Sequence, residues 1–477
     1  MAGAALPTND VAMTLTEVAQ VSGGELRGGD LTVRGVATDS RADLRGKLFL
    51  ALVGERFDGH DFVQKAREAG AAALLVERDV PTTLPSVRVK STLAALGALA
   101  AHRRKVWGGK LVAVAGSAGK TTTRAALSAL LEAAEPGAVH YARGNFNNLI
   151  GVPLVLLSLG ERERLAVAEL GTNQPGEVET LTRMAAPDVA VLTLIGYEHT
   201  EGLGDLDGVE AEEGAAFAHL SATSVAVGNA DDERVRRQLA KAPGRRLSYG
   251  QRADADYCFR VLGVSERGSD LEVGRKLGGR AVTTRFHTTT LGDAGAYAAV
   301  AALCAVEALL GREISEEICN RAFASTVASE AGRLCPVELT GGILLLDDTY
   351  NSNPESVESS LRTARQLADQ RRAPLVLVLG EMRELGALSR SLHEQIGASA
   401  AAQRPALLVA VAGDARFLCD AASARGVQAR FCADAAAAGE LLAAQLSAPA
   451  VVLVKASRGV RAERVVEHLI AAKGRAA

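Results

Sequence analysis

The chain has 477 residues and a formal net charge of -3, and its length predicts about three domains at roughly 150 residues each. Lysines and arginines are scattered along the sequence, which argues against a nucleic-acid-binding protein. No apolar run reaches membrane-spanning length, and residues 1–10 lack a basic region followed by an apolar stretch, so we expect a cytoplasmic protein without membrane insertion. The spacing of the six cysteines favours reduced thiols over a zinc or redox site.

The first part of the chain alternates short apolar runs with helical patterns. Residues 48–53 and 71–76 are predicted to form buried strands. Residues 61–69 are predicted to form a helix, because their apolar positions share one face and Gly70 suits the C-terminal cap. This alternation predicts a mostly parallel sheet. Residues 91–107 show a basic amphipathic pattern, which we interpret as a helix bridging to the next domain.

The remainder of the chain continues this alternation, so the sequence predicts an α/β fold throughout. We expect strands at residues 111–115, 165–169, 189–194 and 225–227, a β excursion within 263–290, and a long helix over 294–310 that ends at Gly311. A third segment starts near Gly332, with strands at 343–346, 375–379, 407–411 and 451–454 and helices between them.

A glycine-rich segment follows the strand at 111–115 and precedes a helical pattern. Glycines allow backbone N–H groups to face phosphates, and the N-terminus of the helix adds partial positive charge. A lysine there can neutralise the terminal phosphates, and a threonine hydroxyl can bind Mg²⁺. The spacing is the shorter Gly-x-x-Gly-Lys-Thr, and an incidental turn of small residues is the alternative interpretation. The loop that we expect to bind ATP comprises Ala115, Gly116, Ser117, Ala118, Gly119, Lys120, Thr121 and Thr122.

Polar side chains follow several of the other predicted strands. Glu169 ends one strand, where a carboxylate points into the usual ligand crevice of an open α/β sheet and could hold Mg²⁺. His199 follows another strand, and a histidine there is more often structural than a metal ligand. Asp347 and Asp348 precede a polar turn at residues 350–354, for which turn chemistry alone is the alternative.

Taken together and in order, these segments resemble the Mur ligase family over nearly the whole chain. Residues 38–41, 46–49 and 58–60 resemble its UDP-binding domain. Residues 116–123, 144–148, 151–153 and 169–171 resemble its central domain. The start of its third domain is matched by residues 332–333 and 347–354. The resemblance implies a small N-terminal α/β domain (1–105), a central P-loop-type ATP-binding domain with a parallel sheet (106–330), and a Rossmann-like C-terminal α/β ligase domain (331–477).

Three stretches favour the family members that add D-alanyl-D-alanine to UDP-N-acetylmuramoyl-tripeptide in peptidoglycan precursor synthesis: residues 348–354, residues 380–386 with His393, and residues 145–148 before 151–153. The resemblance implies that ATP phosphorylates the terminal carboxylate of the tripeptide and that the amine of D-alanyl-D-alanine then displaces phosphate. A Mg²⁺ ion and Lys120 would neutralise the transferring phosphoryl group. A monomer is expected.

The resemblance also implies roles for individual residues. Lys120, Glu169, His199 and Arg333 would be catalytic. Thr121, Glu169 and His199 would bind metal. Outside the loop, ATP would be contacted by Asn148, Tyr297, Arg333, Asp348 and Asn351. The other substrates would be contacted by Ser40, Arg41, Asn147, Asn173 and Tyr350.

Three positions depart from the family pattern, one of them Gln174, which stands where a histidine is common. Glu213 stands where the family usually has a carbamylated lysine, and we hypothesise that its carboxylate replaces the carbamate at the metal, although its reach is shorter by roughly 3–4 Å. Tyr297 stands where an asparagine commonly contacts adenine, and it could stack on the base instead. Two other functions stay open: a ligase that adds a different amino acid or a glutamate tail, and a non-catalytic nucleotide-binding descendant.

Overall fold

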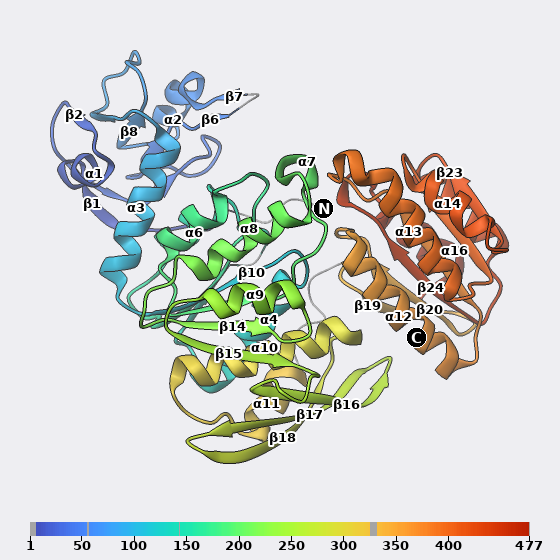
Figure 1. Ribbon diagram of the computed structural model, residues 1–477. Coiled ribbons are helices and arrows are strands. Elements are labelled where there is room, and N and C mark those ends of the chain that lie inside the picture. The colour runs from blue at the N-terminus through green and yellow to red at the C-terminus, as the bar shows by residue number, and fades with distance from the viewer. Residues whose placement is uncertain (1–5, 55–56, 143, 325–331, 477) are drawn as a thin grey trace.

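The computed structural model describes residues 6–54, 57–142, 144–324 and 332–476 and shows three α/β domains, each built on its own sheet (Figure 1). The central domain lies between the other two. The predicted domain boundary at 105/106 falls within the last turn of the bridging helix α3 (Thr92–Trp107), and the predicted boundary at 330/331 lies outside the described residues.

The N-terminal domain has a five-stranded sheet in the order β2-β9-β8-β5-β4, parallel except for the β2/β9 pair. Its strands are β2 (Glu25–Arg27), β4 (Val36–Ala37), β5 (Leu48–Leu50), β8 (Ala73–Val76) and β9 (Ser86–Arg88). Two small antiparallel pairs add β1 (Ala12–Thr14) with β3 (Thr32–Arg34) and β6 (Val53–Gly54) with β7 (Phe57–Asp58). The helices are α1 (Leu15–Ser22), η1 (Gly59–Phe62), α2 (Val63–Glu68) and α3. The helix predicted over 61–69 is therefore a 3-10 turn followed by a shorter α-helix.

Helix α3 joins the first domain to the second, as its pattern predicted. It packs against α1 on one side and against α5 (Gly151–Leu157) and α6 (Glu177–Ala185) of the central domain on the other. The buried Arg104 fixes the contact by donating to the carbonyls of Ala185 and Ala186 and to the Asp188 carboxylate at 2.9 to 3.1 Å. The hydrophobic core of the N-terminal domain is continuous with that of the central domain.

The central domain has a nine-stranded sheet in the order β11-β12-β10-β13-β14-β15-β16-β17-β18, parallel as far as β16 and then antiparallel. The predicted β excursion is the pair of hairpins at its edge. The strands are β10 (Lys110–Ala115), β11 (Val139–Tyr141), β12 (Leu165–Glu169), β13 (Val189–Leu192), β14 (Val225–Asn229), β15 (Arg245–Gly250), β16 (Tyr257–Ser265), β17 (Gly268–Leu277) and β18 (Arg280–Thr288). The further helices are α4 (Lys120–Ala134), α7 (Thr200–Leu203), α8 (Leu206–Ala218), α9 (Glu233–Lys241), α10 (Gly292–Leu310) and α11 (Glu316–Ala324).

Strand β10 is apolar at successive positions because both faces of the sheet are covered. Leu111, Ala113 and Ala115 pack into one hydrophobic cluster, whereas Val112 and Val114 pack into the other. Side chains alternate across a strand, so a strand buried on both faces reads as a continuous apolar run.

Helix α10 corrects one sequence-based expectation, because by length and composition it could cross a membrane. It has 19 residues and a mean hydropathy of 1.6, but 72% of that apolar window is buried inside the fold, where the helix packs against α4. It is therefore a core helix of the central domain.

The C-terminal domain has a six-stranded sheet in the order β19-β20-β24-β21-β22-β23, parallel except for the β19/β20 pair. Its strands are β19 (Cys335–Leu339), β20 (Ile343–Asp348), β21 (Leu375–Gly380), β22 (Leu407–Val411), β23 (Ala429–Cys432) and β24 (Ala450–Lys455). Its helices are α12 (Pro354–Arg371), η2 (Gly386–Leu388), α13 (Ser389–Ala402), α14 (Ala415–Ser423), α15 (Ala435–Gln445), η3 (Arg458–Val460) and α16 (Glu463–Lys473). The six cysteines all lie in the described part of the chain, and no disulfide joins any two of them.

Candidate active site

The glycine-rich loop connects β10 to α4, which confirms the predicted strand–loop–helix arrangement. Gly116 has a φ of 120° and Gly119 a φ of 83°, in the region that favours glycine. A Cβ on Gly116 would lie 2.2 Å from the Thr193 hydroxyl, so the loop has no room for a side chain there. The predicted strand 189–194 ends at Leu192 because Thr193 turns to donate to the carbonyl oxygens of Ala115 and Ala118.

Lys120, the first residue of α4, is partly buried and faces two carboxylates. Its Nζ donates to the Gly116 carbonyl oxygen, lies 3.1 Å from Glu198 Oε2 and lies 3.8 Å from Glu213 Oε1. Burial disfavours the ammonium, but the carboxylates of Glu198 and Glu213 outweigh burial and raise the pKa of Lys120. The lysine is therefore charged and held beside the loop.

Glu213, the hypothesised substitute for the carbamylated lysine, lies directly beneath the loop and is fully buried. Its Oε2 accepts a hydrogen bond from the Gly116 N–H at 2.6 Å. Its Oε1 accepts no hydrogen bond from any described residue. Burial raises the pKa of Glu213 well above its ordinary value, partly offset by Lys120. One of its oxygens thus orders the loop, and the other is available to a cation.

Glu169 ends β12 beside α4 and is also buried. The Thr121 hydroxyl donates to its Oε1 at 3.2 Å, and Asn147 Nδ2 donates to the same oxygen at 3.0 Å. Arg124 donates from Nε to the other oxygen at 3.2 Å. The structure thus brings together three of the predicted site residues, Thr121, Glu169 and Asn147.

His199 faces the third domain instead of Glu169. Its φ is 47°, and its Nδ1 lies 2.6 Å from Glu384 Oε2, which follows β21. The pKa of Glu384 is lowered by its hydrogen bond with this histidine. Among the described residues, no three His, Cys, Asp or Glu side chains are grouped closely enough to hold a metal. The four predicted metal ligands are therefore not assembled into one centre, because His199 pairs with Glu384 and Glu213 pairs with Gly116.

The third domain reaches the phosphate loop through two side chains. Arg333 Nη2 donates to the Thr121 hydroxyl at 2.8 Å, and its guanidinium lies over the Tyr350 ring at 4.3 Å. Asn353 Nδ2 donates to the Ser117 carbonyl oxygen at 3.2 Å. The predicted position of Arg333 beside the ATP loop is thus found in the structure, and it also places Tyr350 there.

Asp348 and Asn351 lie in the same corner of the third domain. The Asp348 carboxylate accepts hydrogen bonds from Lys455 Nζ at 2.8 Å and Ser360 Oγ at 2.6 Å. Lys455 also donates to the Asn351 carbonyl oxygen at 3.0 Å. Asp348 is therefore fixed in place by its own domain, whereas Asn351 is exposed. Direct contact of either residue with ATP stays a prediction.

Tyr297 lies on α10, where neighbouring side chains contact both its hydroxyl and its ring. Its hydroxyl donates to Asp231 at 2.8 Å, and its ring meets the Phe259 ring edge-on with centroids 5.0 Å apart. Burial raises the pKa of this phenol above its ordinary value, so the hydroxyl is protonated and can donate to Asp231. One edge of the ring is thus already packed, and stacking on adenine stays a prediction.

The remaining predicted contacts lie away from the loop or act within the fold. Ser40 is buried, and Arg41 forms an exposed ion pair with Asp39, both in the N-terminal domain. Asn148 accepts hydrogen bonds from the N–H groups at the start of α5. Asn173 donates its backbone N–H to Glu177 at 2.6 Å. Ala118 belongs to the loop, and Thr122 lies in the first turn of α4.

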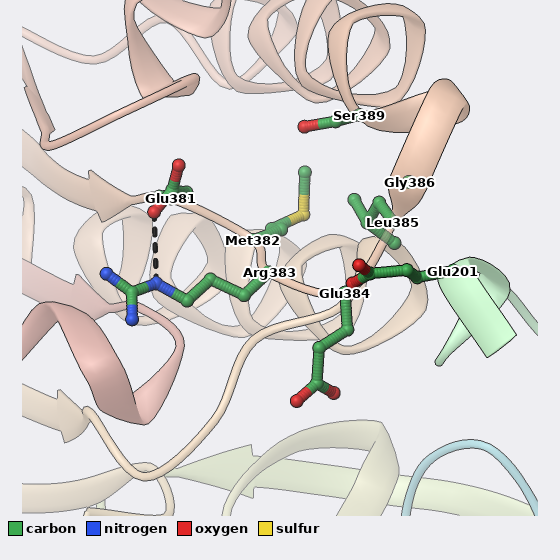
Figure 2. A pocket seen from close by; sticks show the side chains of 8 residues that line it. All are labelled: Glu201, Glu381, Met382, Arg383, Glu384, Leu385, Gly386 and Ser389. Atoms are coloured by element: carbon green, nitrogen blue, oxygen red, sulfur yellow. Dashed lines mark hydrogen bonds and ion pairs between the residues drawn. The ribbon is translucent and has the colours of Figure 1, made fainter. Parts of the chain in front are cut away.

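A cavity of about 360 Å³ lies between the central and third domains, next to the His199–Glu384 pair. Figure 2 shows Glu201 entering it from α7, whereas the other lining residues belong to the segment after β21. Arg383 is ion-paired with Glu381 at 3.0 Å. The Glu201 carboxylate forms no ion pair or hydrogen bond with any described residue. The cavity wall thus offers carboxylates and one guanidinium.

Comparisons with known proteins agree with this arrangement. Sequence models of the Mur ligase family match residues 32–104 ("Mur ligase family, catalytic domain"), 114–306 ("Mur ligase middle domain") and 332–458 ("Mur ligase, glutamate ligase domain"). The UDP-N-acetylmuramoyl-tripeptide–D-alanyl-D-alanine ligase of Escherichia coli is 34% identical, over 96% of this chain and 98% of the relative. The chain belongs to the Mur ligase family. The ligase of the same name from Bacillus subtilis is 31% identical to this Mur ligase, over 92% of the chain and 93% of the relative.

Solved structures place the three domains of this Mur ligase in a known arrangement. A MurF crystal structure from Acinetobacter baumannii superposes with a TM-score of 0.87 at 28% identity, covering 97% of this chain and all of that one. MurF from Thermotoga maritima in complex with ADP superposes with a TM-score of 0.79 at 28% identity, covering 91% of this chain and 96% of that one. This confirms the predicted three-domain α/β architecture.

Sequence reasoning missed four residues that shape the site. Glu198 binds Lys120, Arg124 binds Glu169, Asn353 binds Ser117, and Glu355 accepts the Tyr197 N–H at 2.7 Å. Arg124 could have been found, because it lies one turn beyond Thr121 on the same helix. The other three contacts depend on the approach of separate segments, for which the local sequence holds no signal.

Proposed function

We propose that this Mur ligase uses ATP to join D-alanyl-D-alanine to UDP-N-acetylmuramoyl-tripeptide in peptidoglycan precursor synthesis. The observation that carries the proposal is the contact of Arg333, from the third domain, with Thr121 of the phosphate loop at 2.8 Å. It brings a second cation to the loop that already holds Lys120. Similarity to ligases of this name along nearly the whole chain supports the choice of substrates.

The reaction that follows from this proposal has two steps. The terminal carboxylate of the tripeptide attacks the γ-phosphorus of ATP, which forms an acyl phosphate and releases ADP. The neutral amine of the dipeptide then attacks the acyl carbon, loses its proton and expels inorganic phosphate, which leaves an amide. Lys120 and Arg333 stabilise the charge of the transferring phosphoryl group, and contact between the two domains excludes water from the acyl phosphate.

We also propose that Mg²⁺ assists this reaction. The donor set fits, because Thr121 and Glu169 supply oxygen atoms at one edge of the loop and Glu213 Oε1 is a buried oxygen without a hydrogen-bond donor in the described part of the chain. Bound there, the ion would supply positive charge to the phosphates. Glu213→Gln keeps an acceptor for the Gly116 N–H but removes the charge, so we expect a raised Mg²⁺ requirement. Unchanged activity and Mg²⁺ dependence would refute a metal role for Glu213.

The cavity between the domains suits the acceptor dipeptide, and we propose that it binds there. A dipeptide carries an ammonium and a carboxylate, and the cavity offers the Glu201 carboxylate and the Arg383 guanidinium. We expect Glu201→Gln to raise the KM for D-alanyl-D-alanine while leaving the KM for ATP unchanged. An equal rise for both substrates would argue against a specific contact.

The decisive experiment measures phosphate release with UDP-N-acetylmuramoyl-tripeptide, with and without D-alanyl-D-alanine, and identifies the product by mass. We expect turnover that depends on the dipeptide. Turnover with another amino acid or glutamate only would assign a different ligase reaction, and no turnover with any amine would favour a nucleotide-binding descendant. We further propose that the enzyme acts in the cytoplasm as a monomer. Its domains would comprise residues 1–105, 106–330 and 331–477.

A further inference from the structure

The backbone groups of the phosphate loop divide into two sets. One set has partners inside the central domain: the Gly116 N–H donates to Glu213, and the Ser117 N–H donates to the Leu194 carbonyl oxygen at 2.8 Å. The other set consists of the Ala118 and Gly119 N–H groups, which make no hydrogen bond to any described residue. Free N–H groups at the start of a helix are those that a phosphate-binding loop presents to its ligand.

The Ser117 carbonyl oxygen takes its partner from the third domain. Asn353 Nδ2 donates to it at 3.2 Å, and both residues are buried. A trans peptide is planar, and its carbonyl and N–H point in opposite directions. A donor that holds the Ser117 carbonyl therefore also fixes the direction of the Ala118 N–H on the other side of the same peptide.

Asn353 is itself held rigidly. It is the N-cap of α12, where its Oδ1 accepts the Ser356 N–H at 3.1 Å and its own N–H donates to Ser356 Oγ at 3.1 Å. This capping box uses one side-chain oxygen and leaves the amide nitrogen free to donate. The cap therefore determines where the Nδ2 donor points.

We propose that Asn353 is a positioning residue through which the third domain completes the phosphate loop of the central domain. This proposal rests on the proposed function, since it requires that the loop bind ATP. Docking of α12 orients the Ser117–Ala118 peptide, and the Ala118 N–H then faces the phosphates. By reciprocity, a nucleotide bound to this N–H favours docking of the third domain. Asn353 touches no reacting atom and acts only through the loop backbone.

Asn353→Asp separates this role from helix capping. Aspartate caps a helix as well as asparagine does, so α12 keeps its N-cap. The variant loses the donor and places a carboxylate oxygen against the Ser117 carbonyl oxygen. Ser356→Ala is the matched control, because it breaks the capping box at the same helix end but leaves the Asn353 donor in place.

The first measurement is ADP affinity of the full chain, by calorimetric titration without the other substrates. We expect Asn353→Asp to weaken ADP binding about tenfold or more, as for loss of one buried hydrogen bond, and Ser356→Ala to change it less than about twofold. An ADP affinity of Asn353→Asp within about twofold of wild type, or an equal loss in both variants, would overturn the proposal. Asn353→Ser, which also caps but lacks the amide donor, replaces Asn353→Asp if that variant does not fold.

The second measurement is steady-state turnover. We expect Asn353→Asp to raise the KM for ATP with a smaller change in the KM for D-alanyl-D-alanine, whereas a general defect in docking would raise both equally and would contradict a specific role at the loop. ADP titration needs no amide-bond chemistry. An inactive wild-type protein would therefore refute the proposed ligase reaction while the titration still decides the role of Asn353.

Discussion

Replacement of Arg333 by methionine tests whether the third domain takes part in the chemistry. The side chain joins two features of the site, the Thr121 hydroxyl at 2.8 Å and the Tyr350 ring at 4.3 Å. Methionine fills a similar length but has no charge and no N–H donor. The substitution therefore removes the cation from the loop without opening a large gap beside Tyr350.

The two contacts set the size of the expected effect. A hydrogen bond that involves a charged group is worth about 1.5–3 kcal/mol, and a cation over an aromatic ring about 0.5–2 kcal/mol. Their lower limits add to about 2 kcal/mol, which corresponds to roughly a thirtyfold loss of kcat/KM for ATP. Arg333→Lys keeps the charge but not the planar fork, so we expect a smaller loss.

Arg458 offers the matched control, because its guanidinium lies over the same Tyr350 ring at 5.2 Å but its side chain makes no hydrogen bond to a described residue. Phosphate release is measured for Arg333→Met and Arg458→Met with all substrates present, alongside thermal unfolding to confirm that both variants fold. A loss below about threefold for Arg333→Met, or the same loss in both variants, would refute the reasoning.

Three further predictions concern stability, pH and metal. Arg275→Met breaks a fully buried ion pair with Glu307 and should cost about 3–5 kcal/mol in denaturant unfolding, whereas the exposed Arg285→Met should cost less than about 1 kcal/mol. Burial raises the pKa of Glu355, at the interface with Tyr197, to about 7 from 4.5. The stabilisation that protonated Glu355 gives to the domain contact is therefore full below about pH 4.5 and is lost as pH rises through about 7. We expect the radius of gyration from X-ray scattering to rise over that pH range in the wild type, and to change less in Glu355→Gln. Removal of Mg²⁺ by EDTA should abolish turnover without changing the unfolding temperature.

The sequence predicted the elements whose signals are local. The apolar run of β10, the glycines of the loop and the helix after Lys120 each follow from neighbouring residues, and the structure contains them at the expected positions. The strand at 165–169 is found with its predicted bounds, and Glu169 lies at its end beside Thr121. The carboxyl ends of adjacent parallel strands meet at one edge of a sheet, so a sequence pattern can place such residues together.

Contacts between domains could not be predicted in this way. The pairing of His199 with Glu384 joins residues 185 positions apart and depends on how the third domain docks. No apolar run of membrane-spanning length was expected from the sequence, yet α10 is long and apolar enough by composition; only the structure shows that other elements of the fold bury it. Glu213 was predicted only in part. Its carboxylate was expected near the loop, but its hydrogen bond to the Gly116 N–H was not.

The charges around Lys120 explain why ATP should arrive with a metal ion. Glu198 and Glu213 already face this lysine, so a triphosphate entering the loop adds negative charge where two acidic side chains already surround one ammonium. Arg333 brings one more cation, but only when the third domain is docked on Thr121. A divalent cation bound by Thr121 and Glu169 would make up the difference before docking, and Lys120 could then move from Glu198 to the phosphates. On the proposed mechanism, we therefore expect these acidic side chains to couple nucleotide binding to the metal, and the third domain to add its charge at the step in which the phosphoryl group is transferred.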